Sequence, residues 1–169
     1  MILPDTLPSS MHGVQLVGHG GFDKLVYRED LPVPLPNVGD VLIQVAAAGV
    51  NNTDINTRIG WYSKSVTTET EVGGADGFAM VDDGDASWMG VPLKFPLIQG
   101  ADIVGTVVKG SKLLNKKVIV YPVINNDPNE IRNITDCTYV GSGINGGYAE
   151  YCIVPQELSL IHISEPTRP

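Results

Sequence analysis

The chain has 169 residues and a formal net charge of −8, because 19 acidic side chains outnumber 11 basic ones. This excess of negative charge argues against nucleic acid and against an anionic membrane surface as partners. Apolar residues make up 43% of the chain, which argues against disorder and for one domain with a sizeable core.

The sequence also lacks the patterns of membrane insertion and secretion. No apolar run approaches the roughly 20 residues of a membrane span, and the first residues lack the basic and apolar regions of a secretory signal. Cys137 and Cys152 are the two cysteines, which favours a reducing compartment and free thiols. We therefore expect a cytoplasmic protein without a membrane partner.

Glycine and proline divide the chain into short pieces, which favours strands and turns over long helices. Residues 1–10 are aperiodic and are expected to form a flexible extension before a fold that starts near Met11. Residues 53–59 are expected to form a short helix with Asn52 or Thr53 as N-cap and Gly60 as its stop. The hydrophobic pattern predicts strands over residues 12–17, 24–28, 41–48, 103–109, 117–121 and 148–155.

A long aperiodic stretch, residues 63–93, follows the predicted helix. It holds six acids, and no base lies between Lys64 and Lys94. Because like charges this dense cannot be buried together, we interpret it as a solvated insertion. It is either a lid that narrows substrate choice or an acidic surface loop without a chemical role. Trp61 and Trp88 are expected either to line an apolar pocket or to pack the insertion onto the body.

The remaining segment, residues 122–137, is polar and is expected to be irregular. Six or seven short strands with one short helix predict a mainly β domain of barrel-like form. The insertion of residues 63–93 is an addition to that domain.

Three segments in register resemble the N-terminal, GroES-like catalytic domain of the medium-chain dehydrogenases/reductases. The first reads G-D-V-L-I-Q-V over residues 39–45 and continues with A-G-V-N-x-x-D over residues 48–54. The second is P-x-x-x-G-A-D-x-x-G over 96–105, and the third is G-G-Y-A-E-Y over 146–151, ending in V-P at 154–155. The resemblance implies a GroES-like, partly open β-barrel, here with a short helix and a long acidic insertion. It also implies an oxidoreductase that uses a nicotinamide cofactor, NADPH or NADH.

The resemblance also indicates a branch of this family. Zinc alcohol dehydrogenases carry a Cys ligand where this chain has Asn51, and a His ligand where it has Ala101. A carboxamide and a methyl group cannot replace thiolate and imidazole around tetrahedral zinc. Residues 125–136 also lack the four cysteines of the family's structural zinc lobe. We therefore expect no zinc.

Asn51 with Asp54, Arg58, Gly60 and Tyr62 instead resembles the metal-free quinone oxidoreductase branch. That branch implies hydride transfer to a quinone, an enone or a related carbonyl, a small-molecule substrate. Asn51 and Tyr62 are the candidate donors to the developing enolate oxygen, and Tyr62 is also a candidate proton donor. Asp54 is a candidate catalytic residue that either positions the short helix or takes part in acid–base chemistry. Arg58 either reaches a cofactor phosphate or makes a surface ion pair.

The end of the sequence suggests a fragment. Residues 158–169 resemble a translated sequencing adapter and are expected to be a non-native tail. The GroES-like substrate domain is accordingly expected over residues 11–157, followed in the intact protein by a nucleotide-binding domain that this chain lacks. The complete protein is expected to be a homo-oligomer, and this chain alone is expected to be inactive.

Two other functions remain open from the sequence. The first is a zinc-type alcohol dehydrogenase whose ligands come from unexpected positions. The second is a non-enzymatic GroES-like binding module that shares only the barrel.

Overall fold

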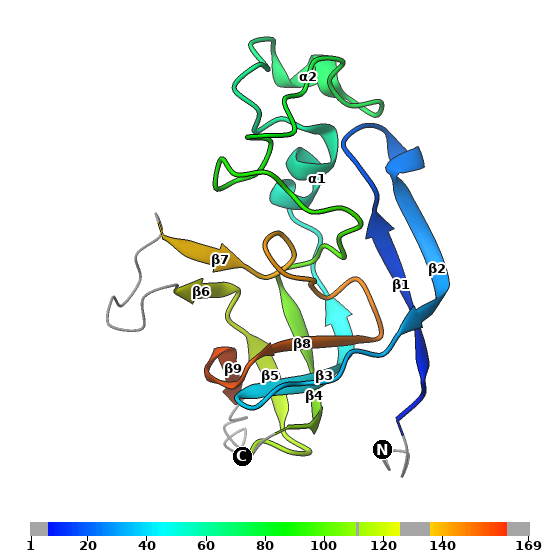
Figure 1. Cartoon of the computed structure of the whole chain (residues 1–169), viewed down its shortest axis with the longest axis vertical. Coiled ribbons are helices and arrows are strands. Elements are labelled where there is room, and N and C mark those ends of the chain that lie inside the picture. The colour runs from blue at the N-terminus through cyan, green and yellow to red at the C-terminus, as the bar shows by residue number, and fades with distance from the viewer. Residues whose placement is uncertain (1–6, 111, 126–135, 162–169) are drawn as a thin grey trace, which may run out of the picture.

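The computed structural model describes residues 7–110, 112–125 and 136–161. Its centre is an antiparallel five-stranded sheet in the order β8-β3-β4-β5-β9, which lies in the lower half of Figure 1. The strands are β3 (Asp40–Ala48), β4 (Ile103–Lys109), β5 (Lys117–Val120), β8 (Tyr151–Pro155) and β9 (Ser159–Ile161). The mainly β fold predicted from the sequence is therefore confirmed.

Strand β3 lies inside the sheet, between β8 and β4, and both of its faces are covered. Val41, Leu42 and Ile43 are all fully buried, and successive side chains of a strand point to opposite faces. Val41 and Ile43 pack into one hydrophobic cluster, whereas Leu42 packs into a second cluster on the other face of the sheet. This explains why the sequence of β3 is continuously apolar at its start rather than alternating.

A hairpin of β1 (Ser10–Leu16) and β2 (Leu25–Pro32), joined through the short 3-10 helix η1 (Phe22–Lys24), lies along one side of the sheet (Figure 1). Isolated bridges from Gly13 to Ala149 and from Leu16 to Leu97 attach it to the body. An added Cβ at Gly13 would come within 3.1 Å of three neighbouring atoms, so glycine permits this close approach. Residues 1–6 of the expected extension lie outside the described residues.

The predicted short helix is present as α1 (Asn52–Ile59). Asn51 is its N-cap, one residue earlier than expected, and Gly60 ends it in the left-handed conformation with φ of 76°. Gly60 is the stop that the sequence predicts, because glycine adopts this conformation without a Cβ penalty. Helix α1 thus starts shortly after the end of strand β3.

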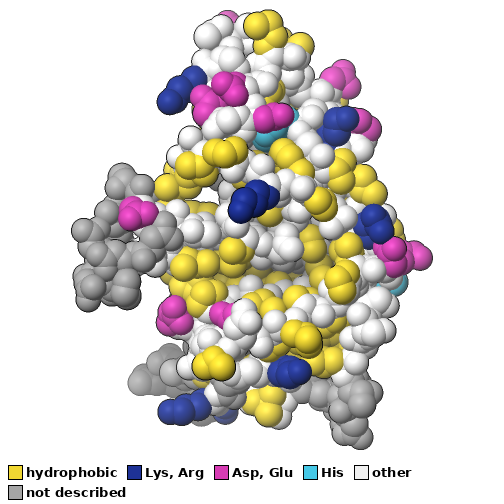
Figure 2. Space-filling view, in the orientation of Figure 1, with side chains coloured by type: hydrophobic (Ala, Val, Ile, Leu, Met, Phe, Trp, Pro, Cys, Tyr) yellow, Lys and Arg dark blue, Asp and Glu magenta, His cyan; other side chains and the backbone are white. Residues whose placement is uncertain are grey.

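The insertion contains one short helix, α2 (Thr70–Gly73), and otherwise consists of turns above α1 (Figure 1). Five of its six acids are exposed, as expected, and the sixth, Asp85, is half-buried. Figure 2 shows several acidic side chains on this upper part of the visible face. The insertion also packs, because Ser63, Ala86 and Ser87 are buried. A description as only a solvated loop is therefore incomplete.

Two further findings differ from the expectations for the end of the chain. Residues 122–137 were expected to be irregular, but β6 (Val123–Asn125) pairs with β7 (Cys137–Tyr139); residues 126–135 between them lie outside the described residues. The fold was expected to stop at residue 157, but the 3-10 helix η2 (Gln156–Leu158) leads into β9, which pairs with β5. Leu158 is buried in the core, so the fold extends through residue 161.

Candidate active site

Asp54, in the first turn of α1, connects three segments that are far apart in the sequence. Its Oδ2 accepts hydrogen bonds from the backbone N–H of Asn51 at 2.9 Å and from the Tyr148 hydroxyl at 2.8 Å. Its Oδ1 accepts from the backbone N–H of Gly100 at 3.2 Å, and its own carbonyl accepts from Gln99 Nε2 at 3.1 Å. Both carboxylate oxygens of this buried side chain are therefore engaged in positioning the site.

Tyr148 completes this arrangement from the segment before β8. Its hydroxyl also lies 3.1 Å from the carbonyl oxygen of Gly49. An added Cβ at Gly100, whose φ is 95°, would come within 2.6 Å of the Tyr148 ring, so only glycine permits the ring to lie there. Burial raises the pKa of Tyr148, and the hydrogen bond to Asp54 raises it further. The phenol therefore stays protonated and acts as a donor to the carboxylate.

Asn51 lies at the N-terminal end of α1, beside the start of β4. Its Nδ2 donates to Asp102 Oδ2 at 2.8 Å. The zinc branch carries its Cys and His ligands at the positions of Asn51 and Ala101. Because Ala101 directly precedes Asp102, the hydrogen bond brings these two positions near each other. The structure thus brings together the first and second of the three motif segments.

Tyr62 lies beyond the other end of α1, in a row of aromatic rings. Its ring makes edge contacts with Trp61 at 5.4 Å and Trp88 at 5.6 Å between centroids. Burial raises the pKa of Tyr62, whereas a side-chain hydrogen bond with Asn56 lowers it. Helix α1, at about 1.5 Å per residue, separates Asn51 from Tyr62 in the chain, and the Tyr62 hydroxyl lies beside Asn56 rather than at the helix start.

Arg58 is buried, with 4% of its surface exposed. Its guanidinium donates to the carbonyl oxygens of Gly20 and Ala75 at 2.6 Å and 3.1 Å and stacks over the Phe22 ring at 4.5 Å. These contacts join the β1–β2 hairpin, α1 and the insertion. They favour a structural role, and the predicted contact with a cofactor phosphate stays a prediction.

A pocket of about 270 Å³ lies against α1. Its wall includes polar groups from Thr53 and Thr57 of α1 and from Tyr139 of β7, and apolar groups from Ala101 and Trp88. Burial raises the pKa of Tyr139, and the nearby groups of Tyr121, Cys137 and Asp102 raise it further. We regard this pocket as the candidate substrate site.

Sequence analysis did not single out the hydroxyl-bearing residues of this pocket. Thr53 was considered only as a helix cap, and Tyr139 directly follows a segment that was expected to be irregular. Asp54 lines the pocket, and Tyr62 contacts the lining residue Trp88. Asn51 does not line the pocket itself; it bonds to Asp102, the neighbour of the lining residue Ala101. The strand pairing between residues 123–125 and 137–139, which places Tyr139 opposite Val123, was not recognised from the sequence.

The side chains around the pocket do not fit a catalytic zinc ion. Asn51 offers an amide already bonded to Asp102, and Ala101 offers a methyl group. Within the described part of the chain, no three His, Cys, Asp or Glu side chains gather as a metal site. Cys152 belongs to the buried core cluster. The independence from zinc expected from the sequence stays a prediction.

The sequence model of the alcohol dehydrogenase GroES-like domain matches residues 37–165. The chain belongs to this family. The match confirms the resemblance that the three motif segments carry, and it runs beyond the expected boundary at residue 157. It also agrees with β9 being part of the fold.

Curated relatives of this GroES-like domain include dehydrogenases and reductases. An NAD-dependent alcohol dehydrogenase of Sulfolobus acidocaldarius is 29% identical over 146 residues, which is 79% of this chain and 36% of the relative. The human quinone oxidoreductase is 26% identical over 143 residues, 85% of this chain and 31% of the relative. The chain thus spans about a third of the length of these relatives.

Solved structures show the same fold. A presumed alcohol dehydrogenase from Sinorhizobium meliloti is 35% identical and superposes with a TM-score of 0.75, covering 96% of this chain and 43% of that one. A thermostable alcohol dehydrogenase from Pyrobaculum aerophilum, 22% identical with a TM-score of 0.62 over 92% of this chain and 42% of its own, supports the fold alone. No helix of the described residues is long and apolar enough to cross a membrane.

Proposed function

We propose that this domain is the substrate side of an NAD(P)H-dependent oxidoreductase that transfers hydride to a quinone, enone or related carbonyl without zinc. A nucleotide-binding domain accompanies it in the complete protein, which we expect to be a cytoplasmic homo-oligomer. One observation carries the proposal: where the zinc branch has thiolate and imidazole, this chain has a carboxamide, Asn51, and a methyl group, Ala101, and Ala101 lines the candidate pocket.

The proposed reaction requires donors for a negatively charged oxygen. The nicotinamide supplies the hydride, and charge then accumulates on the carbonyl oxygen of the acceptor. Fixed N–H and O–H donors aimed at that oxygen lower the barrier. The Asn51 amide has a second hydrogen beyond the one given to Asp102, and Thr53 and Tyr139 add hydroxyl groups to the pocket wall.

In the proposed reaction Asp54 is a positioning residue and Tyr62 is a hydrogen-bond donor. Asp54 positions Asn51 and the pocket wall, because its two oxygens are engaged by Asn51, Gly100 and Tyr148. Burial raises the pKa of Tyr62, so its hydroxyl stays protonated near neutral pH and is a hydrogen-bond donor rather than a base.

The test uses the complete protein, expressed from the full reading frame. Oxidation of NADPH and NADH is followed by the absorbance of the nicotinamide with a panel of small quinones and cyclic enones. Asn51→Ala should lower kcat/KM by about 10²-fold, since removal of one oxyanion donor has effects of this size. Asn37→Ala, an exposed amide in a remote turn, is the control and should leave the rate unchanged. Absence of turnover with every acceptor, or stoichiometric zinc in the purified protein, contradicts the proposal.

Alcohol oxidation is the second candidate, because the Sulfolobus relative is an NAD-dependent alcohol dehydrogenase. It predicts reduction of NAD⁺ by alcohols together with a bound metal ion. Metal analysis of the same preparation, with an alcohol panel, therefore separates the two chemistries. A complete protein that neither binds nor oxidises a nicotinamide would support the non-enzymatic binding module.

A further inference from the structure

Trp88 of the insertion lines the candidate pocket together with Ala101 and Tyr139. It is also exposed, with 58% of its surface in contact with solvent. The residue occupies the boundary at which a bound molecule would meet the insertion.

A tight and partly buried turn holds Trp88 in place. The preceding residues Ala86 and Ser87 are 0% and 2% exposed. Ser87 Oγ accepts a hydrogen bond from the backbone N–H of Val91 at 3.0 Å, and the Ser87 carbonyl accepts from Gly90 at 2.8 Å. On the other side of Trp88, Met89 Sδ lies 4.0 Å from the Cys137 Sγ of β7.

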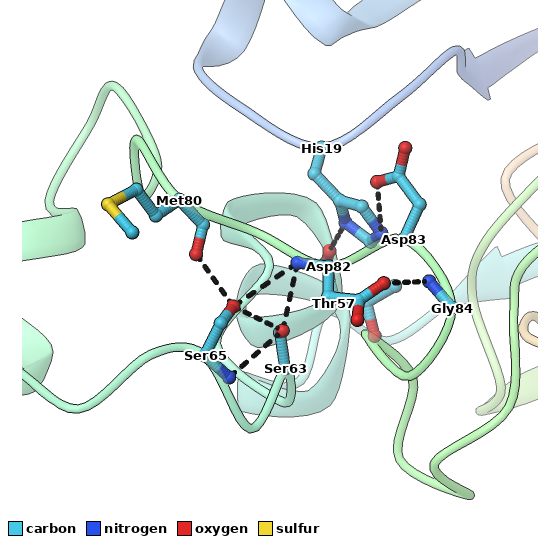
Figure 3. Close-up of polar contacts among 8 residues, drawn as sticks. All are labelled: His19, Thr57, Ser63, Ser65, Met80, Asp82, Asp83 and Gly84. Carbon is cyan, nitrogen blue, oxygen red and sulfur yellow. Dashed lines mark hydrogen bonds and ion pairs between the residues drawn. The ribbon is translucent and has the colours of Figure 1, made fainter.

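The segment before this turn is held by hydrogen bonds within the insertion and by a contact with the turn after β1 (Figure 3). The backbone N–H of Asp82 donates to Ser63 Oγ at 3.0 Å and lies 3.2 Å from Ser65 Oγ. Figure 3 also shows the ring of His19, which bonds the Thr57 carbonyl through Nδ1 at 2.6 Å and faces Asp83 at 3.9 Å. The insertion thus contacts the turn after β1 through Asp83 and His19, and it bonds to the end of α1 through the backbone N–H of Phe78 and the carbonyl oxygen of Ile59 at 3.1 Å.

The ring of Trp88 also contacts the ring of Tyr62. The Tyr62 ring meets it edge-on, with centroids 5.6 Å apart and planes at 86°. Such aromatic pairs contribute about 0.5–1.5 kcal/mol beyond the area they bury. The backbone on both sides of Trp88 is thus held by hydrogen bonds and packing, and its ring contacts Tyr62.

The size of the pocket indicates what a fixed wall would exclude. Its volume of about 270 Å³ lies just below the range of roughly 300–1,000 Å³ of sites for drug-sized ligands. The wall is largely apolar, with hydroxyl groups only from a few side chains. A pocket of this kind accepts a small, flat carbonyl compound and excludes fused ring systems.

We propose that Trp88 is a specificity-determining residue, which restricts the acceptor to single-ring quinones or enones; this rests on the proposed function. The insertion then serves as a permanent wall of the substrate pocket. Its chemical role is to select by size, and it contributes no group to the reaction itself.

The first test measures binding to the chain as it is. Proton–nitrogen correlation spectra resolve the indole N–H of each tryptophan, and a Trp88→Phe spectrum assigns the two signals. Cyclohexenone should shift the Trp88 signal and leave that of Trp61 in place, because Trp61 does not line the pocket. If cyclohexenone and benzoquinone both leave the Trp88 signal unmoved, Trp88 is not part of a binding site and the inference is wrong.

The second test measures selectivity in the complete protein. The ratio of kcat/KM for benzoquinone to that for phenanthrenequinone should fall about tenfold or more in Trp88→Ala, and less in Trp88→Phe. Trp61→Ala is the matched control and should leave the ratio unchanged. An unchanged ratio in an active Trp88→Ala protein overturns the inference alone, whereas binding at Trp88 without any nicotinamide oxidation overturns the proposed function and leaves the wall in place.

Discussion

Asp54 shows how one residue can hold several parts of a candidate site in place. Its carboxylate receives donors from Asn51, Gly100 and Tyr148 in a buried position. Hydrogen bonds to a charged group contribute more than neutral ones, and a buried partner left unsatisfied is costly. The relative positions of three segments of the site therefore depend on the single side chain of Asp54.

We predict that Asp54→Asn lowers the free energy of unfolding by about 3 kcal/mol, because the amide retains one acceptor oxygen and turns its NH₂ group towards existing donors. Urea unfolding measures the change. Asp30→Asn is the control, since Asp30 forms an exposed ion pair with Arg28, and such pairs contribute little. Equal effects of the two substitutions would show that Asp54 does not organise the site.

Sequence motifs predicted part of the site at this scale. The sequence predicted a short helix that contains Asp54 and ends at Gly60, which the structure confirms, whereas Asn51 was expected in the preceding loop and is the N-cap. The contacts of Arg58 with two carbonyl groups were not predictable, because they depend on where the insertion and the hairpin turn meet. Tyr139 was missed for a similar reason, since a three-residue strand leaves almost no periodic signal.

At the scale of elements, the C-terminal end of α1 is where the insertion docks onto the domain. Gly60 has a φ of 76°, and an added Cβ would lie 2.5 Å from a methyl carbon of Val81. Ile59 also accepts a backbone hydrogen bond from Phe78 at 3.1 Å. The stop signal of the helix and the contact with the insertion therefore depend on the same glycine.

We predict that Gly60→Ala lowers the free energy of unfolding by about 3 kcal/mol, combining the strain of the left-handed conformation with overpacking against Val81. Gly90→Ala is the matched control: its φ is 66° and no atom lies within 4 Å of an added Cβ. It should cost only the strain, about 1 kcal/mol. Urea unfolding compares the two variants, and equal losses would mean that Val81 does not pack at this position.

Element prediction succeeded where the pattern is long and failed where it is short. Strands β3 and β4 carry seven or more residues with a clear apolar run, and their predicted positions agree with the structure. Strand β9 has three residues, and its place is decided by pairing with β5 rather than by its own sequence. Residues 158–169 resemble an adapter sequence and were therefore expected to lie outside the fold, but residues 159–161 form a strand of the sheet.

For the molecule as a whole, buried weak acids link its stability to pH. Burial raises the pKa of the Cys152 thiol to about 12, and burial also raises the pKa of Tyr62, Tyr139 and Tyr148. An unfolded thiol titrates near pH 8.5. Between these values the unfolded chain binds fewer protons than the folded one, so the free energy of unfolding falls as pH rises.

We therefore predict a loss of stability above about pH 9, with a slope of up to about 1.4 kcal/mol per pH unit for each such group. Below the unfolded pKa this stabilisation is complete. Urea unfolding at several pH values measures the slope, and Cys152→Ala should flatten it most between about pH 8.5 and pH 9.5, below the pKa of about 10 of an unfolded phenol. A slope that does not change in the variant would refute the assignment to Cys152.

The contacts of Asp54 have a consequence for the time at which the domain forms during synthesis. Its partners Gly100 and Tyr148 follow it by 46 and 94 residues, so the carboxylate emerges from the ribosome long before they do. Until Tyr148 is made, the nascent polypeptide has no way to bury this charge with all its donors in place. The start of the helix is thus translated early but becomes organised last, when nearly all of the described residues exist.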